Sequence, residues 1–326
     1  MNPSGFPREP SIAESSGEGS GHVSSWAARR PLRHYWIHVV CFLATFLACT
    51  AVGARMQENF VRNKPFFDLE RDWEAFWIWI HQPGTAVAGL PFSITLLTIL
   101  LAHEFGHFLA CVYYRVEASL PYFLPAPTFA GTFGAFIRIN SPIYSRRALF
   151  DVGIAGPLAG FAFLLPALGI GLALSKVLPG IAQRGDLVFG TPALVWLLQK
   201  AVFPGVPGSD IYLHPVARAA WIGMLATALN LLPIGQLDGG HILYSLASSR
   251  HKLLSRVFLA ALIPIGIFFW YGWLVWVVIL FFFGMRHPSI YDSSDLGAGR
   301  VKLGWLALAI FLLCLTLAPV QANVEP

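Results

Sequence analysis

The residues best suited to chemistry in this chain are two histidines and a glutamate within five consecutive positions. His103, Glu104 and His107 fall inside an apolar stretch from about Gly89 to Tyr114. On a helix, residues four apart share one face, so both imidazoles can reach one metal ion while Glu104 lies beside them. Two nitrogen ligands and a free carboxylate are typical of a zinc hydrolase, in which the carboxylate is the base that activates water.

Composition places this motif in a membrane. The 326 residues are 56% hydrophobic and only 12% charged, whereas about a quarter of the residues of a typical soluble domain are charged. An ionisable residue in mid-bilayer costs roughly 2.5–3.5 kcal/mol, so a span that carries three of them is expected to do more than anchor the chain. The net charge of +5 comes from basic residues scattered between apolar runs. Membrane orientation explains these charges, and no nucleic-acid partner is expected.

The apolar runs predict an all-α polytopic membrane protein with about six to seven transmembrane helices and a short re-entrant β-hairpin. The expected spans are 36–54, 89–114, 148–175, 214–233, 253–270, 271–284 and 303–319. Basic clusters at their ends place the N-terminus in the cytoplasm. The sequence leaves open whether 253–284 crosses the membrane twice or once as a long tilted helix.

One intramembrane domain, residues 34–320 with a core at 90–245, is expected between two tails. Residues 1–33 are rich in Ser, Gly, Glu and Pro and are predicted to be a disordered cytoplasmic tail, and 321–326 form a short C-terminal tail. Acidic residues in the first tail argue against a transit peptide, which favours a bacterial inner membrane over a plastid membrane. Residues 55–88 are expected to form an external loop with an interfacial aromatic helix.

A catalytic zinc ion takes three protein ligands and keeps one position open. Asp238 is the best candidate for the third, because it is the only acid in the latter half of the chain set between apolar segments. His241 is the rival, and we interpret it as lying beside the site or at the membrane interface. The helix is expected to break over Pro233–Gly240, which would leave Asp238 and polar backbone at depth, as at a functional site.

The stretch Ser119–Pro142 is Pro-rich, then Gly-rich, then alternating in hydrophobicity. It is too apolar for an ordinary cytoplasmic loop and too interrupted for a span. Residues Gly131–Ile139 alternate as a short strand does. We predict a re-entrant hairpin that lines a cavity, with an interfacial loop as the alternative.

Two motifs together resemble the paired signatures of the site-2 protease family of intramembrane zinc metalloproteases. They are His103-Glu-Phe-Gly-His107 and Asn230-Leu-Leu-Pro-Ile-Gly-Gln-Leu-Asp238-Gly-Gly240. The resemblance extends to Gly131–Ile139 and to Phe150–Pro157, and it covers roughly residues 90–245. It implies a protease that cuts a transmembrane segment of a membrane-anchored, often regulatory, protein within the lipid bilayer.

The resemblance also implies roles for individual residues. One Zn²⁺ ion would be held by His103, His107 and Asp238, with Glu104 as the catalytic base. Asn230 would donate to the scissile carbonyl, or else form an interhelical hydrogen bond. The expected substrate-binding residues, which would pair with an unwound substrate strand, are Gly131, Phe133, Gly134, Ala135 and Phe136.

The chain departs from many family members in three respects. The external segment 177–213 is too short for a PDZ domain, no nucleotide-sensing domain follows the last span, and Gly160 stands where an Asn is frequent. Two other functions remain open: a catalytically silent membrane chaperone or scaffold of the same fold, and an intramembrane metal transporter. Metal content and metal flux would distinguish them, whereas substrate identity and oligomeric state have no signature in the sequence.

Overall fold

A computed structural model describes residues 35–66, 83–284, 290, 292 and 294–323. The expected disordered tail, 1–33, and the Trp-rich part of the expected interfacial helix, 67–82, lie outside the described residues. The helices are α1 (Tyr35–Val61), the 3-10 helix η2 (Pro83–Gly89), α3 (Leu90–Tyr113), α4 (Arg146–Ala173), η3 (Ile181–Gln183), α5 (Ala193–Val202), η4 (Gly208–Asp210), α6 (Pro215–Asn230), α7 (Asp238–Leu246), α8 (His251–Phe268), α9 (Gly272–Ile279), the π-helical η5 (Leu280–Gly284) and α10 (Ala298–Cys314). The strands are β1 (Tyr122–Pro125), β2 (Thr132–Phe136), β3 (Lys176–Val177), β4 (Leu187–Phe189), β5 (Ile211–Tyr212) and β6 (Val320–Ala322).

The predicted fold class is confirmed, because long helices dominate and the described strands form only two-stranded sheets. Within the described ranges, 4 helical segments are long and apolar enough to cross a membrane: Tyr35–Val61, Gly84–Tyr113, Arg146–Ala173 and His251–Phe268. Helices α6, α9 and α10 are shorter. The number of spans, predicted as six to seven, therefore stays a prediction.

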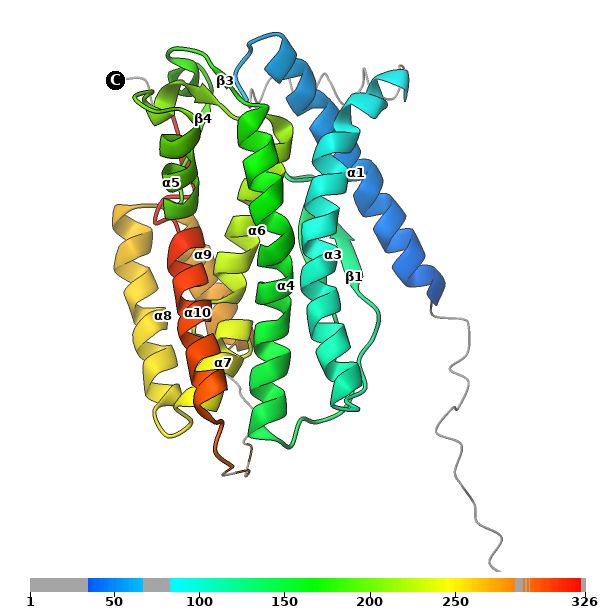
Figure 1. Ribbon diagram of the computed structural model, residues 1–326, viewed down its shortest axis with the longest axis vertical. Helices are drawn as coiled ribbons and strands as arrows, with labels where there is room; N and C mark the ends of the chain where they lie inside the picture. Colours follow the sequence, from blue (N-terminus) through cyan, green and yellow to red (C-terminus); the bar gives the residue numbers. More distant parts are fainter. Residues whose placement is uncertain (1–34, 67–82, 285–289, 291, 293, 324–326) are drawn as a thin grey trace, which may run out of the picture. The chain divides into compact units, whose positions relative to one another are not determined.

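Helix α4 lies at the centre of the bundle, packed against α3, α6 and α7 (Figure 1). Glycines bring these helices to backbone contact. A Cβ on Gly106 of α3 would lie 2.4 Å from the carbonyl oxygen of Ala155, and one on Gly171 would lie 2.3 Å from the backbone nitrogen of Ala217 on α6. Since no larger residue fits at these points, the small residues set the spacing of the three helices.

A short irregular segment, 231–237, separates α6 from α7. Helix α6 ends at Asn230 and α7 begins at Asp238. The break was expected to extend to residue 240, but Gly239 and Gly240 form part of the first turn of α7. A Cβ on either glycine would lie 2.0 or 2.3 Å from a backbone carbonyl oxygen of the preceding segment. Only glycines therefore allow the new helix to fold back so closely against the break.

The stretch 253–284, which the sequence left open, folds as two helices. Helix α8 ends at Phe268, α9 begins at Gly272, and the two pack against each other. Of the two, only α8 has the length of a span.

The described residues after α10 include a short strand. Strand β6 (Val320–Ala322) pairs antiparallel with β4, and the backbone N–H of Asn323 donates to the carbonyl of Asp186 at 2.8 Å. The expected tail at 321–326 is thus partly a strand, because the edge of β4 offers backbone partners that composition does not reveal.

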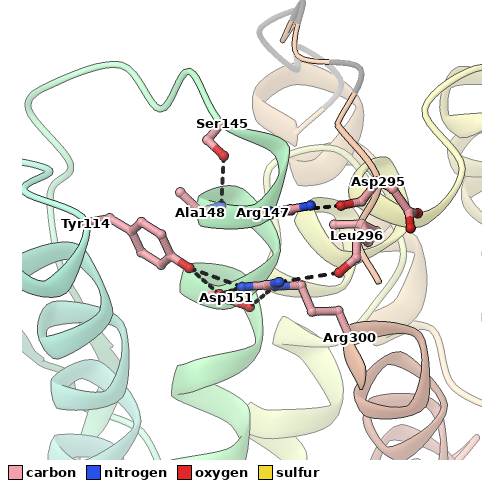
Figure 2. Close-up of polar contacts among 8 residues, drawn as sticks. All are labelled: Tyr114, Ser145, Arg147, Ala148, Asp151, Asp295, Leu296 and Arg300. Carbon is pink, nitrogen blue, oxygen red and sulfur yellow. Dashed lines mark hydrogen bonds and ion pairs between the residues drawn. The ribbon is translucent and has the colours of Figure 1, made fainter. Parts of the chain in front are cut away.

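An ion pair joins α4 and α10, with Tyr114 after α3 hydrogen-bonded to it, at the end of the bundle opposite β3 and β4 (Figures 1 and 2). Arg300 donates from Nε and from a terminal nitrogen to the two carboxylate oxygens of Asp151, at 2.8 and 2.7 Å, and the Tyr114 hydroxyl donates to the same carboxylate. Ser145, not Asp151, is the N-cap of α4, and it accepts from the Ala148 N–H at 3.5 Å.

The segment that precedes α10 docks on the same end of α4. Asp292 accepts from the backbone N–H of Ser294 at 2.9 Å and of Arg146 at 3.0 Å. These hydrogen bonds stabilise the charged carboxylate and lower the pKa of Asp292 to about 2, and the bond from Ser294 has the largest effect. Arg147 donates from Nε to the carbonyl of Asp295 at 2.8 Å (Figure 2). The start of α10 is therefore tied to α4 through polar contacts.

Candidate metal centre

Helix α3 presents both histidines on its buried face. His103 and His107 are 5% and 7% exposed, and their Nε2 atoms lie 3.2 Å apart. The helix is apolar and has Pro91 in its first turn, where a missing N–H costs nothing. The expected placement of two imidazoles one turn apart on one face is observed.

Helix α4 forms the wall behind the two rings. A Cβ on Gly156 would lie only 2.1 Å from Nε2 of His107, and one on Gly160 would lie 3.3 Å from Nδ1 of His103. The same helix orients one ring, because the carbonyl oxygen of Val152 lies 2.7 Å from Nδ1 of His107. Nδ1 thus carries the proton and donates, which leaves the Nε2 lone pair pointing into the site.

Asp238 completes a three-residue cluster from the far side of the irregular segment. Its Oδ2 lies 3.2 Å from Nε2 of both His103 and His107. This oxygen is buried and accepts no hydrogen bond in the described structure. Tetrahedral ligands about 2.0–2.1 Å from one zinc ion lie roughly 3.4 Å from each other, so three ligand atoms spaced by 3.2 Å fit a single ion.

Asn230, the last residue of α6, contacts the cluster of His103, His107 and Asp238 through His103. Its Nδ2 lies 3.1 Å from Nε2 of His103. His241 lines the cavity beside the cluster. A Cβ on Gly153 of α4 would lie 3.0 Å from the Cβ of His241. The cluster of ligand atoms contains Asp238 and excludes His241.

Glu104 stands beside the cluster without belonging to it. The side chain is 5% exposed and lines the same cavity, and the backbone of Ile137 lies within hydrogen-bonding reach of its carboxylate. Its position suits a base that works on a group bound next to the metal ligands.

A cavity of about 440 Å³ opens over the cluster. The antiparallel hairpin of β1 and β2, with Tyr122 opposite Phe136, forms one side of it. Two of the expected substrate-binding residues, Ala135 and Phe136, line this cavity.

Three other expected substrate-binding residues do not line the cavity. A Cβ on Gly131 would lie 2.7 Å from the backbone of Cys49, so this residue docks the hairpin on α1. Phe133 is 73% exposed, and Gly134, with φ of +107°, has open space around it. Gly134 is a position where the backbone conformation favours glycine.

Several cavity residues were missing from the expected site. They are Ile137, Arg138, Ile139, Val152, Gly153, Gln236 and Leu237. The alternation of the hairpin segment and the polar Gln236 within an apolar break were signals that could have identified part of this set. Val152 had no such signal, since it acts through its backbone carbonyl.

Residues 91–272 match the model of Peptidase family M50, and this stretch is more than half of the 326 residues. The chain belongs to Peptidase family M50. The match includes α3 with its two histidines and α7 with Asp238, and it confirms the resemblance to the site-2 proteases. The described residues between α4 and α6 form short strands, 3-10 turns and α5, and they contain no PDZ domain.

Similar M50 proteins include plant enzymes named as probable zinc metalloproteases. The chain is 33% identical over 72% of its length to probable zinc metalloprotease EGY1, chloroplastic, of Arabidopsis thaliana, covering 43% of that protein. It is 32% identical over 71% of its length to EGY1 of Oryza sativa subsp. japonica, covering 41%, and 31% identical over 69% to EGY2 of Arabidopsis thaliana, covering 41%. The chain thus spans less than half the length of the relatives it matches.

Proposed function

We propose that this M50 protein is an intramembrane zinc metalloprotease that hydrolyses peptide bonds within or next to transmembrane segments of membrane-anchored proteins. The observation that carries the proposal is the position of Asp238 Oδ2, 3.2 Å from Nε2 of both His103 and His107 although it comes from another helix. A buried carboxylate oxygen without a hydrogen-bond donor is costly unless a cation neutralises it.

Zinc is the metal that the names of the relatives indicate, and His103, His107 and Asp238 are the residues that would hold it. Two imidazoles and a carboxylate match the ligand set of catalytic zinc sites, which leave one position open. When bound, zinc supplies a Lewis acid that polarises a carbonyl and makes water more acidic.

Protein groups around the metal ligands supply the remaining chemistry. The Glu104 carboxylate takes the proton from the attacking water and returns it to the leaving amide nitrogen. The Nδ2 of Asn230, which already lies 3.1 Å from His103 Nε2, can turn to donate a hydrogen bond to the carbonyl oxygen of the scissile bond. The 440 Å³ cavity gives room for an extended peptide backbone beside these groups.

The β1–β2 hairpin provides the means to hold such a backbone. Its sheet has only two strands in the described structure, so one edge of β2 has no partner strand there. A substrate helix hides its peptide bonds, whereas an unwound segment added to this edge exposes them. In this proposal Ala135 and Phe136 contact the substrate directly, Phe133 and Gly134 contact it outside the cavity, and Gly131 fixes the hairpin.

A plastid membrane is the location that the relatives favour, because their names describe them as chloroplastic. The acidic N-terminal residues had favoured a bacterial inner membrane. The helices of spanning length support a multi-pass membrane protein in either case.

The deciding experiment compares the wild-type protein with Glu104→Gln in the same membranes. The amide keeps the shape of the carboxylate but takes no proton, so zinc should stay bound while cleavage falls by at least about 100-fold. A membrane-anchored protein should then accumulate uncut, and mass spectrometry of the two membrane proteomes would identify it. Retained cleavage would remove Glu104 from its role.

A matched control is Glu117→Gln, since Glu117 is an exposed acid just beyond the same helix. This variant should cleave like the wild type. Zinc flux in vesicles would support the transporter instead. An intact metal site with partner binding but no cleavage by wild type would support the chaperone or scaffold.

A further inference from the structure

Arg218, near the start of α6, is a cation with no anionic partner among the described residues. Its guanidinium carbon lies 4.4 Å from the ring centre of Phe66 and 4.7 Å from that of Phe189. Its Nε is buried and has no hydrogen-bond partner, and no carboxylate of the described residues forms an ion pair with it. Two aromatic faces compensate only part of the cost of removing a charge from water.

The guanidinium borders a cavity of about 70 Å³ that also carries neutral polar groups. Gln199 of α5, a residue that is 7% exposed, lines the cavity and offers a side-chain amide, and Thr191 adds a hydroxyl. No acidic side chain belongs to the described lining. The carbonyl of Gly190, another lining group, already accepts from Trp221 Nε1 at 2.8 Å. The described lining thus combines one positive charge with side chains that can donate hydrogen bonds.

The cavity is separate from the metal centre. Arg218 and Asn230 are at opposite ends of α6, which at 1.5 Å per residue places them roughly 18 Å apart. Figure 1 shows the neighbouring α5, β3 and β4 at the end of the bundle away from the Arg300 ion pair. Helix α5 exposes Trp196 and Leu197, by 53% and 49%, as a helix at a membrane interface does.

We propose that the cavity beside Arg218 binds a small oxyanion of the phosphate or sulfate type, free in solution or carried by a lipid headgroup. One guanidinium balances one negative charge, and its planar fork pairs with two oxygens. The Gln199 amide and the Thr191 hydroxyl approach from α5 and its start, so they can serve further oxygens. A volume of about 70 Å³ is roughly that of two liquid water molecules, which restricts the site to a small anionic group.

The test is thermal unfolding of the full chain in a neutral detergent. One arm adds inorganic phosphate or sulfate, with sodium acetate at equal ionic strength as the reference. The other adds phosphatidylglycerol to the micelles, with phosphatidylcholine as the reference. Near saturation, at least one arm should raise the Tm by on the order of 4 °C. Arg218→Met should abolish this shift, whereas Arg184→Gln, a change at an exposed arginine of the same region, should retain it.

Each outcome decides the proposal. A shift with inorganic phosphate or sulfate assigns a free ion, and a shift with phosphatidylglycerol alone assigns a headgroup. A Tm that rises in neither arm above its reference, or a shift that persists in Arg218→Met, overturns the site. If Arg218→Met does not fold, Gln199→Leu replaces it and should weaken the apparent affinity about tenfold. Unchanged affinity in that variant would equally overturn the proposal.

Discussion

The contact between α4 and His107, a proposed metal ligand, leads to a sharp prediction for Gly156→Ala. The added methyl would lie 2.1 Å from Nε2 of His107 and 2.4 and 2.5 Å from two ring carbons. Ordinary contacts between such atoms are about 3.5–4.0 Å. Because α4 is packed on several sides, the imidazole must give way by more than about 1 Å.

A displacement of that size acts on the ligand atom itself. It also strains the 2.7 Å hydrogen bond from Nδ1 of His107 to the Val152 carbonyl, which sets the orientation of the ring. Misplacing a reacting group by about 1 Å costs on the order of 100-fold in rate. Loss of ligand orientation typically costs about 10- to 100-fold in metal affinity. We expect Gly156→Ala to lose zinc affinity and cleavage activity by about 100-fold each.

Gly169→Ala is the matched control on the same helix. A Cβ there meets nothing within 4 Å, and alanine favours helix over glycine by about 1 kcal/mol in a helix interior. Zinc affinity, measured by competition with a chelator in detergent, and the Tm should therefore match or exceed the wild-type values in this control. The same two measurements on Gly156→Ala separate a lost ligand from a lost fold.

The reasoning would be refuted if Gly156→Ala bound zinc as tightly as Gly169→Ala while remaining folded. That result would mean that His107 has room to move without leaving the metal, or that His107 is not a ligand.

Three other predictions concern the third ligand and the polar contacts at the far end of α4. Asp238→Asn should lower zinc affinity by at least about 100-fold, because a neutral amide is a much weaker ligand than a carboxylate; near-wild-type affinity in a chelator competition would argue against the assignment. Arg300→Met should lower the free energy of unfolding by about 1–2 kcal/mol, since it leaves the partly exposed Asp151 without its cation. Adding Asp151→Asn should cost less than the sum of the single changes, and strict additivity in denaturant unfolding would show that the pair contributes nothing. The pKa of Asp292 is lowered to about 2 in the folded chain, against about 3.9 for a free aspartate. Its contribution to folding stability is therefore present above pH 4 and is lost as the pH falls towards 2. Asp292→Asn should remove this acid-sensitive part of the dependence of unfolding on pH, and an unchanged dependence would contradict the assignment.

Local patterns in the sequence indicated the two candidate metal-binding histidines and the membrane character of the chain. His103 and His107 are four residues apart in an apolar run, and helix geometry alone puts them on one face. Hydropathy predicted the helical fold, because a bilayer allows few other structures for such runs. The irregular segment before Asp238 could likewise be located from Pro233 and the neighbouring glycines.

Longer-range features were decided only by the tertiary structure. Nothing in the order of residues shows that Asp238 Oδ2 lies 3.2 Å from both imidazoles, because that distance depends on the packing of α7 against α4. The glycine face of α4 behind the rings and the pairing of Asp151 with Arg300, 149 residues away, depend on the same packing.

The cavity beside Arg218 belongs to this second class. An arginine near the start of a helix is an ordinary residue in sequence, and its neighbours at 66, 189 and 199 come from separate segments. Side-chain spacing within one helix follows from local backbone geometry, whereas contacts between segments depend on which surfaces exclude solvent together. The sequence therefore determined the chemistry available at the metal site, and the fold determined which groups meet there.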